Sequence, residues 1–139
     1  GPIVFITSAG GALGQVLKVS GAGDSLAQMV LNTGLPFILI PFVISGLLKV
    51  VQGSGTVAVT TAATLCAPIA ASLGLDPILI FLASGAGASL CCHVNDSYFW
   101  VYTNCMGYDM KTGLKTLSIS NVVMSLGGLA ATFICSLWL

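Results

Sequence analysis

The sequence contains no arginine and no glutamate, and charged residues of any kind are scarce. Four lysines and four aspartates make up 6% of the chain and balance to a net charge of zero, whereas soluble domains carry roughly 25% charged residues. A soluble protein has to cover its surface with polar side chains, and this chain lacks them. The shortage excludes a soluble enzyme, and the absence of basic patches excludes a nucleic-acid-binding protein.

Motifs for catalysis and metal binding are also missing. The chain has no G-x-S-x-G, H-E-x-x-H or P-loop lysine motif, so we expect neither an enzyme nor an ATP-driven pump. The one histidine, His93, directly follows two cysteines, which is not zinc-site spacing. We therefore expect no metal and no cofactor. The odd number of cysteines forms no secreted disulfide framework, and we expect buried, reduced thiols: Cys66, Cys91, Cys92, Cys105 and Cys135.

Long uncharged intervals separate the few charges, and hydrophobic residues make up 56% of the chain. A helix that crosses the hydrocarbon core of a bilayer needs ~20 mostly apolar residues, and each interval is about that long. The segments 35–51 and 117–139 are apolar on all sides. We therefore predict an all-α polytopic membrane protein surrounded by a lipid bilayer. The long uncharged intervals are 1–17, 25–48, 50–75, 77–95 and 116–139.

Polar and glycine-rich segments divide this apolar sequence. Residues 1–19 are mostly apolar, and residues 20–34 form a more polar connector. The chain begins Gly-Pro-Ile-Val-Phe-Ile, without an initiator methionine, and we expect further sequence upstream of it. Beyond the connector we expect three units: a helical hairpin over 35–74, a broken helix over 78–103 and a last transmembrane helix over 117–139.

Prolines and polar residues suggest where the helices begin and end. Pro36 suits a first helical turn, so the first helix is expected over 36–51 and the second over 57–73. A third apolar stretch covers 78–92, and residues 104–115 are expected to form a polar loop.

The first polar interruption, Gln52–Thr56, lies between two apolar helices. Each helix would be about 25 Å long, which is short for crossing a bilayer but suits a re-entrant hairpin. Gly53 and Gly55 would permit a tight tip, where polar side chains and free amides could bind hydroxyls or a carboxylate. Lys49 lies one turn earlier, where a charge is costly unless it meets an anion or a partner. The alternative is an interfacial loop with Lys49 reaching the headgroups.

The second interruption is His93–Ser97, after which apolar residues resume at Tyr98. Non-helical backbone at membrane depth has to be buried in protein or line an aqueous cavity. Transporters use such breaks, because helix ends and unwound carbonyls can hold anions, cations or protons. The alternative is that Asn95 or Asp96 simply caps the next helix. A lone histidine is more often structural than functional, and the role of His93 stays open at this point.

Three strings resemble the gluconate permease family, the bacterial gluconate:proton symporters and their relatives. They are GGALGQVLKVSGAGDSLA (10–27), KVVQGSGTVAVTTAA (49–63) and HVNDSYFWV (93–101). The resemblance covers essentially the whole chain and corresponds to the C-terminal third of a full-length member. The family is grouped with the ion-transporter superfamily, whose members contain inverted repeats, each with a re-entrant hairpin and a broken helix. The resemblance implies that Lys49–Thr56 forms the second hairpin tip and His93–Ser97 the centre of the second broken helix.

The resemblance also implies secondary active transport of gluconate or a related sugar or hydroxy acid by proton symport. Such a substrate needs an anchor for its carboxylate and hydrogen-bonding groups for its hydroxyls. For the carboxylate we expect Lys49 and the amides of the tip residues Gly53, Ser54, Gly55 and Thr56. For the hydroxyls we expect Gln52, Ser54, Thr56, Asn95 and Ser97. Asp96 is the expected proton carrier, because a dry site favours protonation of a carboxylate, and His93 is the second candidate.

The expected partners are the organic anion, the proton, the bilayer and an N-terminal repeat from the missing part of the same chain. A homo-oligomer is a further possibility, and the expected location is the bacterial inner membrane, as a multi-pass protein. A channel or passive pore is an alternative function, since a pore would also use polar breaks. A permease for another small substrate, such as an amino acid, is the other alternative.

Overall fold

The computed structural model describes residues 34–73 and 76–138, together with five isolated positions. The described residues form helices, turns and irregular segments without a strand, which confirms the all-helical expectation for this part of the chain. The expectations for the apolar stretch 1–19 and the connector 20–34 lie outside the described residues, apart from those positions and Gly34. The isolated positions are Ala12, Val16, Val19, Ser20 and Asn32.

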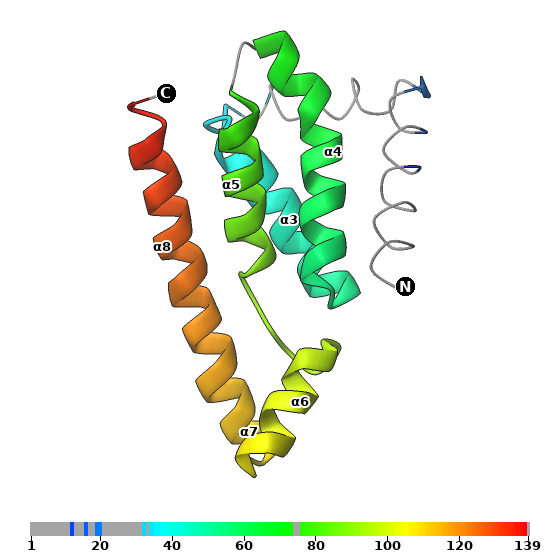
Figure 1. The fold of residues 1–139 in the computed structure, drawn as a ribbon, viewed down its shortest axis with the longest axis vertical. Helices are drawn as coiled ribbons and strands as arrows, with labels where there is room; N and C mark the ends of the chain where they lie inside the picture. The colour runs from blue at the N-terminus through cyan, green and yellow to red at the C-terminus, as the bar shows by residue number, and fades with distance from the viewer. Residues whose placement is uncertain are drawn as a thin grey trace.

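The described helices follow one another with short connections (Figure 1). Their bounds are α3 (Leu39–Gln52), α4 (Gly55–Leu73), α5 (Pro77–Ala88), α6 (Ser97–Met106), α7 (Met110–Gly113), the π-helical turn η1 (Leu114–Ser118) and α8 (Ile119–Cys135).

Helices α3, α4 and α5 form one packed group, and α8 runs along the outer side of α5 (Figure 1). Small residues let the helices approach closely. The Ser45 hydroxyl of α3 donates to the Ser84 carbonyl of α5 at 2.7 Å. A Cβ added at Gly87 would lie 2.9 Å from the carbonyl carbon of Phe42. The backbones of α3 and α5 therefore touch.

The second packed group joins α6 to the start of the last helix. Phe99 is fully buried, and it packs with Cys92 and Leu117. The Ser118 hydroxyl donates to the Cys92 carbonyl at 2.5 Å, and the Ser125 hydroxyl donates to the Ala86 carbonyl at 2.6 Å. These contacts position the segment between α5 and α6 against the last helix.

The first helix begins at Leu39 rather than at Pro36, and Pro41 explains the difference. Starting at Leu39 places Pro41 in the first turn, where its missing N–H costs no helical hydrogen bond. A helix from Pro36 would instead place the Pro41 ring against the carbonyl of Phe37.

The expected polar loop over 104–115 is wrong for most of its length. α6 continues to Met106 and ends at Gly107, which has a left-handed φ of 65°. A continuous helix then begins at Met110, so only 107–109 lie outside helices. The two lysines of this segment, Lys111 and Lys115, thus lie in the first turns of the last helix, before its apolar part.

Among the described residues, one helix is long and apolar enough to cross a membrane, Met110–Cys135 with 26 residues. Its length is about 39 Å, against ~30 Å of hydrocarbon. Helices α3, α5 and the segment Gly55–Ala67 are apolar but shorter. Length and composition alone also fit a buried core helix, although only 17% of the most apolar part of this helix is buried.

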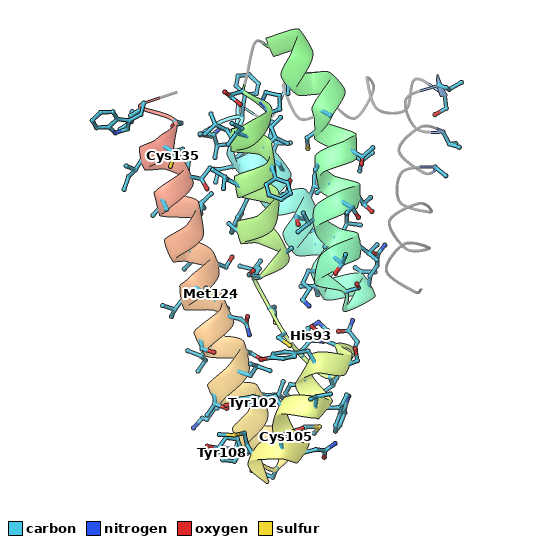
Figure 2. The ribbon with its side chains drawn as sticks, viewed as in Figure 1. His93, Tyr102, Cys105, Tyr108, Met124 and Cys135 are labelled. Carbon is cyan, nitrogen blue, oxygen red and sulfur yellow. The ribbon has the colours of Figure 1, made fainter. Side chains whose placement is uncertain are left out.

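The cysteines differ from one another in exposure. Cys66 and Cys92 are buried and Cys91 is half-buried, but Cys105 and Cys135 are exposed. Figure 2 shows Cys105 on α6 and Cys135 near the far end of α8. The expectation of burial is therefore wrong for these two, because they lie on helix faces that no described element covers.

Candidate functional site

The first polar interruption is shorter in the structure than in the sequence pattern. α3 extends through Gln52 and α4 begins at Gly55, so only Gly53 and Ser54 lie outside helices. Gly53 adopts φ 71°, and its amide donates to the Lys49 carbonyl at 2.8 Å. The Ser54 hydroxyl accepts a hydrogen bond of 3.4 Å from the Val57 amide. The chain reverses within two residues, and α3 and α4 form a tight helical hairpin.

The second interruption is longer than expected and begins earlier. α5 ends at Ala88, and the backbone is non-helical from Ser89 to Asp96. Apolar residues after Ala88 do not continue the helix. In this segment the Cys92 carbonyl accepts a hydrogen bond from the Ser118 hydroxyl of the last helix. In Figure 1 this segment is the extended link between α5 and α6.

Asp96 begins α6 as its N-cap. Its Oδ1 accepts a hydrogen bond of 2.9 Å from the Tyr98 amide. Asp96 therefore makes the helix cap that the alternative interpretation of this motif described. The cap leaves its other oxygen, Oδ2, for a different partner.

That partner is Lys49, which lies 47 residues earlier in the chain. The Lys49 ammonium forms a buried ion pair with Asp96 Oδ2, and each residue is only 7% exposed. The ammonium also donates to the Gly53 carbonyl at 3.3 Å. Lys49 therefore points into the protein rather than toward solvent, which contradicts the alternative in which it reaches the headgroups.

The Cys92 thiol completes the surroundings of the Asp96 carboxylate, since it donates to Oδ2 at 3.3 Å. Two buried ions are costly to desolvate unless they are paired and further hydrogen-bonded. Here the carboxylate receives the ammonium, a thiol and a backbone amide at the positive end of α6. This set of donors explains why both charges can be buried.

Asn95 joins the two interruptions directly. Its side-chain amide donates to the Val50 carbonyl at 2.8 Å and to the Val51 carbonyl at 3.3 Å. These carbonyls belong to the last turn of α3, where helical partners are missing. A Cβ at Gly53 would collide with the carbonyl oxygen of Asn95 and would lie 2.8 Å from its carbonyl carbon. The hairpin tip and the broken segment are in van der Waals contact.

The structure thus brings together Lys49, Gly53, Asn95 and Asp96. A Cβ at Gly55 would lie 3.9 Å from the Lys49 ammonium, so the start of α4 borders the same place. The remaining predicted substrate-binding residues are neighbours of these residues in the chain. Ser54 is half-buried, and three others are exposed: Gln52, Thr56 and Ser97.

His93 is half-buried, and Figure 2 shows it beside the start of α6. Its Nδ1 accepts a long hydrogen bond of 3.5 Å from the backbone N–H of Asn95. Within the described part of the chain, no hydrogen bond links its ring to Asp96 or Lys49.

Sequence reasoning missed Cys92 as a member of this site. The residue was placed among the apolar cysteines, yet its thiol contacts the one buried carboxylate of the motif. Its position four residues before Asp96 was the available signal, but the segment is not helical, so helical spacing alone does not predict the contact.

A separate groove of about 390 Å³ lies between α5 and α8. It is lined mainly by apolar and small residues, including Phe81, Gly85, Met124 and Gly128, and by none of the predicted site residues. Within the described segments no group of three His, Cys, Asp or Glu residues is placed to hold a metal ion.

Comparison with known proteins gives one family and several bacterial relatives. Residues 1–138 match the family described as GntP family permease. An uncharacterized permease of Haemophilus influenzae is 41% identical over 133 residues, which cover 94% of this chain and 27% of that protein. The Gnt-II system L-idonate transporter of Escherichia coli is 36% identical over 91% of this chain and 29% of its own.

The gluconate permease of Bacillus licheniformis is 33% identical over 99% of this chain and 31% of its own length. The chain thus spans less than a third of each of these curated relatives. No solved structure matches the chain.

Proposed function

Because this chain belongs to the GntP family of permeases, we propose that it is part of a proton symporter for gluconate or a related sugar or hydroxy acid. Relatives named gluconate permease and L-idonate transporter support this substrate class. The relatives are bacterial, and one is named an inner membrane permease, which supports a multi-pass protein in that membrane.

The proposed architecture is half of an inverted-repeat transporter. α3 and α4 would form the re-entrant hairpin, α5 and α6 the broken helix, and Met110–Cys135 the last transmembrane helix. The 14 residues of α3 correspond to about 21 Å, too short for a full crossing of ~30 Å. The N-terminal repeat would come from the rest of a longer protein, as the greater length of the relatives suggests.

The observation that carries the proposed function is the buried Lys49–Asp96 pair at the contact between the two helix breaks. A buried ion pair inside an apolar protein is costly and is commonly retained for function. Lys49, together with the amides of 54–56 at the start of α4, would bind the substrate carboxylate, since both carry positive charge or donor groups. The Gly53 amide, which we also expected to bind the carboxylate, already donates to the Lys49 carbonyl.

The hydroxyls of a sugar acid require neutral donors and acceptors around that anchor. Five polar side chains in and beside the site would supply them: Gln52, Ser54, Thr56, Asn95 and Ser97. Asp96 would carry the coupled proton, because it is the buried carboxylate of this site. His93 remains the second candidate for that role.

Uptake by cells or vesicles containing the permease from its complete reading frame tests this proposal. We expect accumulation of labelled D-gluconate above the outside concentration, and its loss on addition of a protonophore. A passive pore would equilibrate gluconate without accumulating it, and protonophores would leave that equilibration unchanged. Unlabelled L-idonate should compete, whereas competition only by amino acids would overturn the substrate class.

A further inference from the structure

We propose that Asp96 and the carboxylate of the transported anion bind Lys49 in turn. Protonation of Asp96 would release Lys49 from the ion pair and make it available to the anion. The inference rests on the proposed function and adds the coupling step that links proton to substrate. The substrate anion would not join the ion pair; it would replace one member of it.

The geometry supports exchange rather than addition. The Lys49 ammonium is paired with Asp96 Oδ2, and it also donates a hydrogen bond of 3.3 Å to the Gly53 carbonyl. The pair is enclosed, with each residue 7% exposed. A carboxylate entering beside an ionised Asp96 would place two like charges at one cation, which disfavours the charged form of one of them.

Charge balance leads to the same conclusion. The empty site, with an ionised Asp96, is neutral, because one ammonium meets one carboxylate. Adding a monovalent anion would leave one uncompensated negative charge in a buried site, which is costly. Protonation of Asp96 makes the site positive by one charge, and the anion then restores neutrality. One proton and one monovalent anion would therefore bind together.

The surroundings of Asp96 allow the neutral acid to stay in place. Oδ1 keeps its hydrogen bond from the Tyr98 amide, since a protonated carboxyl still accepts. The Cys92 sulfur, at 3.3 Å from Oδ2, can accept the carboxylic proton weakly. Asp96 would thus remain the N-cap of α6 in both protonation states, and the step would move a proton without unwinding the helix.

The titratable groups that face Asp96 are few. Among the described residues, α3 contributes Lys49 and the broken segment contributes Cys92. The His93 ring accepts from the Asn95 backbone instead. α4 borders the pair through Gly55, which has no titratable side chain, and the last helix contacts the segment through the Ser118 hydroxyl. Asp96 is the carboxylate among them, so replacing it should remove the proton dependence of anion binding.

The test measures D-gluconate binding to the purified permease, made from its complete reading frame, between pH 5 and pH 9. If one proton has to bind together with the anion, gluconate binding weakens about tenfold for each pH unit above the pH at which Asp96 titrates in the empty site. We expect this slope in the unmodified protein. In Asp96→Asn the slope should disappear, and gluconate should bind at high pH as well as at low pH. Asp96→Asn should also lose accumulation while still exchanging gluconate across the membrane.

Asp76→Asn is the matched control. Asp76 is also a helix N-cap, since its Oδ1 accepts from the Ile78 amide at 2.8 Å, but among the described residues it has no lysine partner. It should keep the pH slope. If Asp96→Asn does not fold, proton uptake by the unmodified protein decides the question. We expect about one proton taken up per gluconate bound above the titration of the carboxyl.

The possible results separate the two proposals. Gluconate binding without proton uptake, or an unchanged slope in Asp96→Asn, overturns the exchange at Lys49 and leaves the substrate class standing. Failure of the unmodified protein to bind gluconate at any pH overturns the substrate class and the exchange that depends on it.

Discussion

Gly53 lies directly against the main-chain carbonyl of Asn95, with no room for a side chain between them. The left-handed turn that ends α3 therefore touches the segment that separates α5 from α6. This contact brings Lys49, one turn before Gly53, to the carboxylate of Asp96, directly after Asn95. The site depends on the closeness of two backbones, which only a glycine permits here.

Gly53→Ala should therefore reduce both folded yield and gluconate uptake. Alanine in a left-handed conformation costs about 1 kcal/mol, and the collision with Asn95 should add about 1–3 kcal/mol. Gly107→Ala is the control, because Gly107 has φ 65° but nothing within 4 Å of its added Cβ. Thermal denaturation and uptake should separate the two variants. Equal effects would show that the contact with Asn95 contributes nothing.

Asn95→Ala should loosen the contact from the other side. It removes the amide that donates to the Val50 and Val51 carbonyls, and each lost hydrogen bond costs about 1 kcal/mol. We expect lower thermal stability and weaker uptake, with Asn95→Gln recovering little because its longer side chain misplaces the amide. Asn104→Ala, at an exposed position of α6, should leave both measurements unchanged. Uptake by Asn95→Ala at the level of Asn104→Ala would contradict this role.

Lys49→Met should weaken gluconate binding roughly 10- to 100-fold, because it removes the charged hydrogen-bond donor that would bind the carboxylate of the anion. It should also destabilise the protein by about 3 kcal/mol, since Asp96 is left buried without its cation. The double variant Lys49→Met with Asp96→Asn should regain most of that stability but not the binding. Thermal denaturation and equilibrium binding measure the two effects.

Lys111→Met, at an exposed lysine of α7, should change neither stability nor binding. Strictly additive stability losses in the double variant would mean that Lys49 and Asp96 do not interact.

Gly87→Ala should destabilise the packing of α3 on α5. Its Cβ would collide with the Phe42 backbone, an overpacking cost of about 1–3 kcal/mol. Gly85→Ala, two residues earlier in the same helix and with nothing within 4 Å, should instead raise stability by up to about 1 kcal/mol through helix propensity. The midpoints of thermal unfolding should move in opposite directions. A midpoint that rises in both variants would mean that α3 and α5 are not in backbone contact.

Much of the helical architecture could be predicted from the sequence, because long apolar runs and glycine or polar interruptions are local properties. The hairpin turn at Gly53 and Ser54 lies inside the predicted interruption, and the Asp96 cap lies inside the second. The ends of the helices were predicted less well. Pro41 moved the first helix start to Leu39. α5 ends at Ala88, earlier than its apolar sequence suggested, and the segment after it contacts the last helix through Cys92.

By itself, the sequence determined an apolar, helical chain with two polar breaks, since the scarcity of charge and the spacing of helix breakers act locally. Only the tertiary structure decided that Lys49 pairs with Asp96 across 47 residues. That pairing depends on how closely Ser45, Gly46 and Gly87 let α3 approach α5, and on the bend at Ser89–Asp96. Neither has a signature in residue order, because the energy of a buried charge depends on which group faces it in space.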